Sequence, residues 1–440
     1  GIRNLGGLPP WAQGAPAITW QVTMVDYDMD GDLDIFNADD QCALPNSKFG
    51  GIDRGFLQIW DNDGNGNFTN RTVDAGMNIP SPWMGLSFAD FNSDGYLDVF
   101  STSFGDWGKP FVGVPIAVGD ETSRWFLGTP DKKYTDVGVG DLGRMPFGWG
   151  TTARDFDNDG DTDISFHGGM DMWFMIDSSN PGTMLLNDGD ANFGLDRDAF
   201  ETHHSRRNNA GSAAGDINND GFADIITVSN FNFRATHPLV QYGGANAEVN
   251  YFTIFDNTAY LTPVFDMDVP DQFVWNGTTF DNGTITVELN SADNGNNWAR
   301  VRLLGSVGIT TDGRSKRDGI GAIVSFTPRH GKTVMEPILG GASHMSQDSL
   351  TRTFGMERAH TGTVDILWPG GTRNRYDFVR HGDDLVIPEI PCSYDTTDDR
   401  HTYNTCVDDA LSELYIAGVI DHRMKHKLRS SARRAYRDAH

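Results

Sequence analysis

Aspartate recurs at alternate positions in "DFDNDGDTD" (155–163), and similar stretches are "DYDMDGDLD" (26–34), "DFNSDGYLD" (90–98) and "DINNDGFAD" (216–224). In chain order we name these four stretches acidic loops 1 to 4. Alternate oxygen-bearing side chains can converge on one point, and glycine at position 6 permits the sharp turn that this requires. A site with oxygen ligands alone favours a hard cation, and calcium fits best because it accepts many ligands in flexible geometry.

In each acidic loop the side chains at positions 1, 3, 5 and 9 and the backbone carbonyl at position 7 are the predicted ligands. The side chains are Asp26, Asp28, Asp30, Asp34, Asp90, Asn92, Asp94, Asp98, Asp155, Asp157, Asp159, Asp163, Asp216, Asn218, Asp220 and Asp224. The carbonyls belong to Asp32, Tyr96, Asp161 and Phe222. Without a cation, clustered carboxylates repel by on the order of 1 kcal/mol per pair even in water. About four calcium ions, one per loop, are therefore expected, and four divalent ions would change the net charge from -27 to −19.

The loops do not match an EF-hand, which needs a bidentate glutamate at position 12 and a helix on each side. Position 12 is occupied by Asn37, Ser101, Phe166 and Thr227. The flanking residues are short apolar segments of β type, such as "LDIFNA" after loop 1 and "ADIITVS" after loop 4. A single acidic turn could exist without metal, but four copies in register favour a repeated metal site.

The acidic loops follow one another at intervals of 64, 65 and 61 residues, which indicates repeated units. Apolar segments joined by Asn/Asp-Gly turns at 57–77 and 184–196 predict hairpins, and 133–141 is typical of the second half of another. Units of about 60 residues with four strands are typical of β-propeller blades. We therefore expect an all-β fold with a propeller of four or five blades over residues 1–245.

Three further segments follow the repeats. Residues 246–296 hold no acidic loop and are interpreted as a degenerate blade or closing segment. Alternating apolar residues in "WARVRLLG", "AIVSFTP" and "TVDILWPGG" predict a small β domain over 297–390. Residues 391–440 are predicted to form a helical tail.

The tail is expected to contain two helices. The first would begin near Asp408 and Asp409 and carry Leu411, Leu414, Ile416 and Ile420 as its apolar residues. The second, strongly basic, would run from about Asp421 to Ala439. Residues 422–440 hold seven Lys/Arg against one Asp. This basic helix is expected either to bind an acidic surface, such as a membrane, a polymer or a neighbouring copy, or to pack on its own chain.

The composition of the chain excludes some classes of binding partner. A net charge of -27 and a pI near 4.6 argue against nucleic acid. The sequence contains no apolar run of 18 residues, so it predicts no transmembrane helix. The first residue, Gly1, suggests a processed mature chain. Cys392 and Cys406 could form a disulfide that leaves Cys42 unpaired, although an odd count of cysteines equally allows free thiols.

Other residue types that could do chemistry carry less weight. His167, His203 and His204 lie near acidic loops, and "GGMDMWFM" (168–175) is rich in methionine, which packs between blades more often than it binds soft metals. Ser343, His344 and Asp348 invite comparison with a catalytic triad, but a structural role is favoured. Glycosylation sequons begin at Asn67, Asn70, Asn276 and Asn282.

Two parts of the chain resemble known families. The acidic loops resemble the calcium loops of FG-GAP/VCBS repeats, which form the blades of integrin-type propellers. Residues 297–379 resemble the ASPIC/UnbV domain through "NWARVRLLG", "SKRDGIGAIV", "GGASHMSQDS", "TFGM" and "VDILWPGGT". The pairing is similar to the cartilage acidic protein family and its bacterial homologues. The low repeat count, the segment 246–296, the basic tail and the lack of an EGF-like module depart from that family.

The resemblance implies a secreted, extracellular or periplasmic calcium-bound scaffold and no settled activity. We therefore expect a scaffold or adhesion protein at the cell surface or in the matrix, assembling with other extracellular proteins, glycans or copies of itself. No convergent set of nucleophile, base and orienting group is evident, which argues against an enzyme. The alternative is an extracellular hydrolase or a glycan-binding protein that uses the mouth of the propeller.

Overall fold

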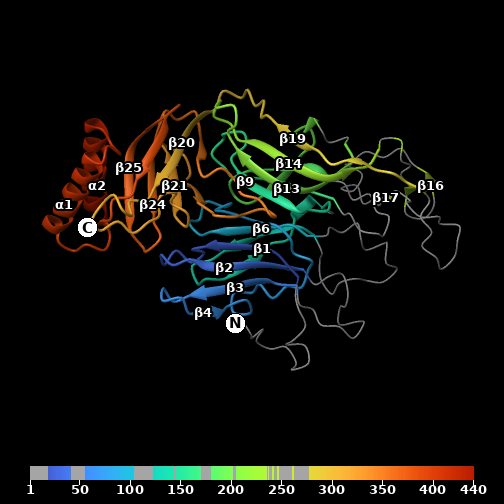
Figure 1. The fold of residues 1–440 in the computed structure, drawn as a ribbon, viewed down its shortest axis with the longest axis horizontal. Coiled ribbons are helices and arrows are strands. Elements are labelled where there is room, and N and C mark those ends of the chain that lie inside the picture. Colours follow the sequence, from blue (N-terminus) through green and yellow to red (C-terminus); the bar gives the residue numbers. More distant parts are fainter. Residues whose placement is uncertain are drawn as a thin grey trace.

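The computed structural model describes residues 18–40, 55–103, 122–142, 145–169, 180–201, 205–234, 236 and 277–440, and three short strands between 240 and 261. Within these residues the chain is mostly β. Each of the four repeats forms its own antiparallel sheet, and a β domain and two helices follow (Figure 1).

The first two sheets are four-stranded meanders in which neighbours along the chain pair with each other. The first sheet contains β1 (Ile18–Val25), β2 (Asp34–Asp40), β3 (Leu57–Asn62) and β4 (Phe68–Asn70). The second contains β5 (Leu86–Ala89), β6 (Asp98–Ser101), β7 (Arg124–Gly128) and β8 (Tyr134–Asp136). A 3-10 turn, η3 (Gly140–Leu142), comes next. The strand at β8 confirms the hairpin predicted at 133–141.

The third sheet repeats this order with β9 (Gly150–Arg154), β10 (Asp163–Gly168), β11 (Asn180–Asn187) and β12 (Phe193–Asp196). The fourth contains β13 (Arg207–Gly215), β14 (Asp224–Asn232), β18 (Asp281–Asn282) and β19 (Ile285–Glu288). Both β18 and β19 pair with β14, so the end of the segment 246–296 supplies the third-strand position of the fourth sheet. Short strands β15 (Val240–Gln241), β16 (Ala245–Asn246) and β17 (Tyr260–Leu261) form a separate sheet.

The four sheets stack in chain order, with an apolar core between each successive pair. We call the side of a sheet that faces the next sheet its front face, and the side that faces the previous sheet its back face. Phe36 on the front of the first sheet meets Phe88 on the back of the second, with ring centroids 5.2 Å apart. The next two cores join Phe100 and Trp125 to Ile164, and Met184 to Ala214 and Ile225.

The stack is open at both ends in the described residues. The back face of the first sheet and the front face of the fourth both carry exposed apolar side chains. The sheets therefore have the blade-like architecture of four-stranded antiparallel sheets, and the described residues do not close into a ring.

One mixed sheet and one antiparallel sheet form the domain at 297–390, which we call the C-terminal β domain. One sheet has the order β23 (Arg352–Glu357), β20 (Asn297–Leu304), β26 (Asp384–Pro388), and β20 and β26 run parallel. The other has the order β22 (Val334–Pro337), β21 (Ile323–Pro328), β24 (Thr361–Leu367), β25 (Arg373–Arg380).

Helices α1 (Arg400–Ile416) and α2 (His422–Ala439) cover β25 at one end of the molecule, far from β14 and β19 (Figure 1). The helix α1 begins earlier than predicted, because the Asp399 side chain accepts a hydrogen bond from Thr402 N–H and caps it. Asp408 and Asp409 thus lie in its middle, and Ile416, one of the apolar residues expected in this helix, is 82% exposed. The helix α2 lies as predicted, capped by Asp421.

The C-terminal β domain shares a core with the repeats. Its Ile323, Met335, Leu339, Ala342 and Leu367 pack in the cluster that lies between the first two sheets. The segment 342–349, which we call the central segment, pairs with the first strands of the later sheets. Ser343 exchanges two backbone hydrogen bonds with Leu86 in β5, Thr151 N–H in β9 donates to Ser343 Oγ, and Ser349 N–H donates to Ala214 O in β13.

Candidate metal centres

Every acidic loop connects the first two strands of its sheet and folds around its first aspartate. In loop 3 the Asp155 carboxylate accepts hydrogen bonds from the backbone N–H groups of Asp159 and Gly160, at 3.1 and 2.9 Å. The equivalent bonds form in the other three loops. Glycine at position 6 is required by its backbone, because φ lies between +90° and +99° in all four loops.

The last aspartate of every loop bonds the end of the third strand of its sheet or, in loop 4, a residue just beyond β19. Asp163 Oδ1 accepts from Asn187 N–H at 2.9 Å, and its Oδ2 accepts from Phe156 N–H at 2.9 Å. Equivalent bonds join Asp34 to Asn62, Asp98 to Gly128 and Asp224 to Asn290. These aspartates were predicted only as ligands, and the strand pairing that gives them a second role was not evident from the loop alone.

Carboxylates converge closely in two of the loops. Ligand oxygens of Asp26, Asp28 and Asp34 all lie within 4.8 Å of one another in loop 1. Those of Asp155, Asp157 and Asp159 do so in loop 3. Both triads could hold a metal ion, whereas loops 2 and 4 carry Asn92 and Asn218 at position 3 and offer one carboxylate fewer. Asp30 and Asp163 lie outside the two triads.

Burial raises the pKa of several of these carboxyl groups, so they ionise less readily. It raises the pKa of Asp26 to about 7 and that of Asp34 to about 8, and the neighbouring carboxylates in loop 1 add to both shifts. Burial likewise raises the pKa of Asp90 to about 6 and that of Asp98 to about 8. In loop 3 it raises the pKa of Asp155 and Asp163 well above the usual value. A bound cation would stabilise the charged forms, so the residues fit a hard cation.

Basic side chains from other parts of the chain contact loops 1 and 4, and another lines a cavity beside loop 3. The Lys132 ammonium, on the turn between β7 and β8, contacts the Asp28 carboxylate in loop 1. Lys332 Nζ lies 3.0 Å from Asp190 Oδ1, beside a cavity of about 550 Å³ that Asp159 and Asp161 also line. Arg300 bonds Asp216 Oδ2 of loop 4 at 2.8 Å. These neighbours were not predicted, because they are distant in sequence and carry no spacing signal.

The C-terminal β domain contacts all four acidic loops. Gly370 N–H donates to Gly31 O in loop 1 at 2.7 Å, and Asp90 N–H in loop 2 donates to Met335 O at 3.1 Å. Gly355 N–H donates to Asp155 Oδ2 in loop 3 at 3.1 Å, and Arg300 donates to Asp216 in loop 4. The "WPGG" turn thus lies on loop 1 and β23 lies on loop 3. The loops are therefore part of an interface inside the chain as well as candidate metal centres.

A buried ionic cluster lies near these contacts. Glu336 Oε2 is 3.2 Å from Arg154 in β9 and 3.3 Å from Arg352 in β23, and Arg154 also bonds Asp348 at 2.8 Å. All four side chains are almost inaccessible to solvent. Burial raises the pKa of Glu336 and lowers that of Arg352 to about 10. Because each charge has a buried partner, the cluster ties the third sheet to the C-terminal β domain.

Ser343, His344 and Asp348, the residues compared with a catalytic triad, make structural contacts with the neighbouring sheets. Ser343 Oγ accepts from Thr151 N–H, and Asp348 bonds Arg154 and Ala214 N–H. His344 packs on Trp149, with ring centroids 4.6 Å apart, and burial lowers its pKa to about 4. In the described structure no hydrogen bond joins the three residues to one another.

The remaining candidates take no part in the loops. His167 is buried on the front of the third sheet against Phe200, and burial lowers its pKa to about 3. Asn67 and Asn282 are exposed, and Asn70 is half-buried. His203, His204, Cys42, Asn276 and most of the methionine-rich stretch lie outside the described residues.

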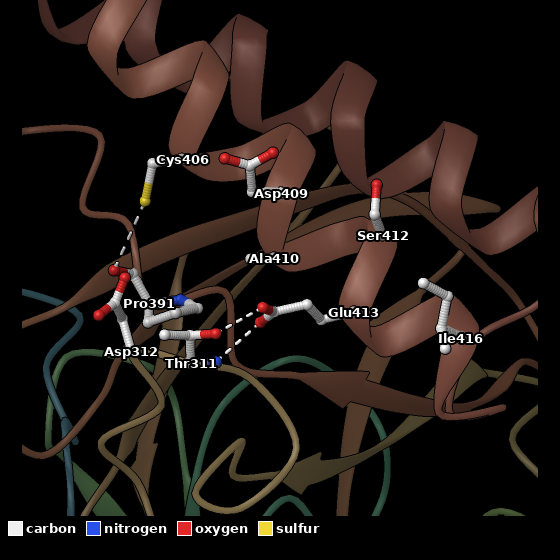
Figure 2. A pocket seen from close by; sticks show the side chains of 9 residues that line it. All are labelled: Thr311, Asp312, Pro391, Cys406, Asp409, Ala410, Ser412, Glu413 and Ile416. Atoms are coloured by element: carbon white, nitrogen blue, oxygen red, sulfur yellow. Dashed lines mark hydrogen bonds between the residues drawn. The ribbon is translucent and has the colours of Figure 1, made fainter.

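The tail is fastened to the C-terminal β domain at several points. A disulfide joins Cys392 to Cys406 in α1. Figure 2 shows the adjacent pocket of about 400 Å³, where Glu413 reaches across to accept hydrogen bonds from Thr311 N–H and Oγ1 at 2.7 and 2.6 Å. The Glu413 carboxylate is thereby engaged in holding α1 in place.

The basic helix α2 makes many bonds within its own chain. Leu428, Ala432 and Tyr436 are its buried face, and the basic side chains contact acids and rings nearby. Those contacts join Lys427 to Tyr376, Arg429 and Arg433 to Asp408, and Arg434 to Asp377. Among the described residues, no helix is both long enough and apolar enough to span a membrane.

Comparison with known proteins agrees with this division of the chain. Residues 312–392 match the family model "ASPIC and UnbV", and residues 48–101 match the model "FG-GAP-like repeat". No curated protein sequence matches the chain. A solved structure, the biofilm matrix protein Bap1 of V. cholerae, is similar at a TM-score of 0.26 and 11% identity. The match covers 82% of this chain and 56% of Bap1, so the chain spans little more than half the length of that protein. The chain therefore carries an FG-GAP-like repeat and an ASPIC/UnbV domain.

Proposed function

We propose that the protein is an extracellular scaffold whose four acidic loops bind calcium and thereby hold the repeats and the C-terminal β domain in one rigid body. FG-GAP-like repeats typically bind calcium. In this role the ion is structural, supplying the positive charge that clustered carboxylates need before they can all be ionised. No catalytic step is assigned to it.

The observation that carries the proposal is the contact of the C-terminal β domain with every acidic loop. Gly355 N–H donates to the carboxylate of Asp155, the first residue of loop 3, and Arg300 donates to that of Asp216 in loop 4. A cation that orders a loop also orders the surface on which the C-terminal β domain rests. Binding and stability of the whole chain are therefore linked.

The predicted ligands keep their assigned positions in this proposal. In loop 1 Asp26, Asp28 and Asp34 would hold the ion, and in loop 3 Asp155, Asp157 and Asp159. Loops 2 and 4, with one carboxylate fewer, are expected to bind more weakly. The Cys392–Cys406 disulfide supports a location outside the cytoplasm, because structural disulfides persist in oxidising compartments.

Calorimetric titration of calcium into the chelator-treated full chain tests the proposal. We expect heat of binding and a rise in melting temperature, both reduced when Asp155, Asp157 and Asp159 are changed together to Asn. A variant with Asp196→Asn, Asp198→Asn and Glu201→Gln carries the same change of charge outside the loops and should behave as the wild type. Absence of binding heat together with an unchanged melting temperature would refute a structural role for calcium.

A further inference from the structure

Among the described residues, the repeat stack ends on two faces that no further sheet covers. On the back of the first sheet, Val22 and Met24 in β1 are 53% and 49% exposed. On the front of the fourth sheet, Ile285 and Val287 in β19 are 73% and 49% exposed, and Val228 in the paired strand β14 is 45% exposed. The register places Val228 opposite Ile285, so these side chains form one apolar surface. We call the two surfaces the back end face and the front end face.

The same repeat positions are buried wherever a neighbouring sheet exists. Met24 precedes its acidic loop by two residues, and the residues two before loops 2, 3 and 4 are at most 3% exposed. Those residues are Phe88, Ala153 and Ala214. Each of them packs against the front of the preceding sheet. Met24 therefore occupies a position that is an interface residue in the later repeats, and in the described part of the chain no sheet covers it.

The front end face gives the matching result. Val287 lies three residues before Asn290, whose N–H bonds the last aspartate of loop 4. The equivalent residues, three before Asn62, Gly128 and Asn187, are buried against the next sheet. They are Ile59, Trp125 and Met184. The fourth sheet thus presents the surface with which each earlier sheet contacts its successor.

We propose that the front end face of one copy of this chain packs on the back end face of a second copy, continuing the stack across molecules. The inference rests on the scaffold function proposed above and names its partner, a second copy. At each of the three internal interfaces, the front of one sheet packs on the back of the next. The front end face and the back end face use the same repeat positions, so we expect them to be complementary to each other. Because the two end faces differ, the contact is heterologous and repeats from copy to copy, giving a filament or a closed ring.

Two substitutions test the two end faces independently. Both are at exposed positions, so the internal cores remain intact. Val287→Glu places a charge on the front end face, and Met24→Glu places one on the back end face. Ile416→Glu, at an exposed position on α1 far from both, is the matched control. The full calcium-loaded chain is examined by sedimentation velocity over a wide range of concentration, and calcium binding is measured by calorimetry on each variant.

Wild type and Ile416→Glu are expected to show at least about a doubling of weight-average mass as concentration rises, while each end-face variant alone stays monomeric. An equimolar mixture of the two variants should form dimers and nothing larger, because only one pair of intact end faces remains. A monomeric wild type, or self-association that survives either substitution, would overturn the proposal. Unchanged calcium binding in the variants would show that such a failure concerns assembly alone, leaving the scaffold proposal standing.

Discussion

The backbone N–H of Asn187 donates a 2.9 Å hydrogen bond to Asp163 Oδ1, which joins acidic loop 3 to the third strand of its own sheet. A second N–H, from Phe156, binds the other oxygen of the same carboxylate. The side chain of Asn187 continues the connection, since its Nδ2 donates to Phe91 O in loop 2 of the preceding repeat at 2.8 Å. One aspartate and one asparagine thus connect two acidic loops and two sheets.

Replacing Asp163 with alanine is expected to destabilise the chain even when calcium is absent. The change leaves the buried N–H groups of Phe156 and Asn187 without acceptors, at a cost of about 2–4 kcal/mol in the free energy of unfolding. Chemical denaturation with chelator present measures this. Asp163→Asn retains one acceptor oxygen and should lose less. Equal losses in the two variants would show that the backbone bonds to Asp163 contribute little.

The cation-free protein should lose stability as pH rises from about 4 to about 8. The folded chain holds protons on Asp26 and Asp34, whose pKa values are raised by burial to about 7 and about 8, while the unfolded chain has released them. Between these limits the folded state binds more protons, so the free energy of unfolding falls with increasing pH. Melting temperatures measured in chelator across this range provide the check. Saturating calcium should flatten the profile, and a cation-free profile that rises with pH would contradict the assignment.

Changing Lys132 to alanine should strengthen calcium binding at loop 1. The ammonium contacts Asp28 and must give way before a cation can approach that carboxylate. Because Lys132 is half exposed, the ion pair is worth about 1 kcal/mol, or roughly a fivefold gain in affinity. Calorimetric titration measures the gain. Lys133→Ala removes the adjacent charge, which pairs with Asp131, and should leave the affinity unchanged.

Glu336→Gln should be strongly destabilising, by about 3–5 kcal/mol in the free energy of unfolding. The substitution leaves the buried guanidinium groups of Arg154 and Arg352 without their shared carboxylate. Urea denaturation of the calcium-loaded chain measures the loss. The exposed Glu357 in the same domain provides the control Glu357→Gln, which should unfold like the wild type. A loss below about 1 kcal/mol would mean that Asp348 alone balances the two arginines.

Removing the disulfide with Cys392→Ser and Cys406→Ser should loosen the tail while leaving the repeats folded. Its loop is short, with a sequence separation of 14, so the cross-link contributes about 3 kcal/mol by limiting the unfolded chain. Hydrogen exchange of α1 reports the local effect. The helix should retain part of its protection, because Glu413 still bonds Thr311.

The sequence predicted the features that repeat and missed those that depend on distant pairing. Strand, acidic loop and strand follow from alternation and turn residues within about ten positions, which is why all four sheets begin and turn as expected. The start of α1 at Arg400 was missed, because Asp399 as a cap was overlooked in favour of the acids at Asp408 and Asp409. Contacts such as Lys132 with Asp28 join separate repeats and leave no local pattern.

The fourth sheet illustrates the same limit. Its third-strand position, β19, lies more than 50 residues after β14 in sequence, so the regular spacing of the earlier repeats does not reveal it. The triad comparison failed for a related reason. Ser343, His344 and Asp348 are close in sequence, yet each serves a different neighbour in the stack.

The central segment has a consequence for the order in which the chain can fold during synthesis. Leu86 in β5 finds its backbone partner in Ser343, and Ala214 in β13 finds its partner in Ser349. At ordinary rates of synthesis, a ribosome needs on the order of tens of seconds to pass from Leu86 to its partner Ser343. Throughout that time the inner edges of the sheets are unpaired. We therefore expect the nascent repeats to be recognised by chaperones until the C-terminal β domain has been synthesised.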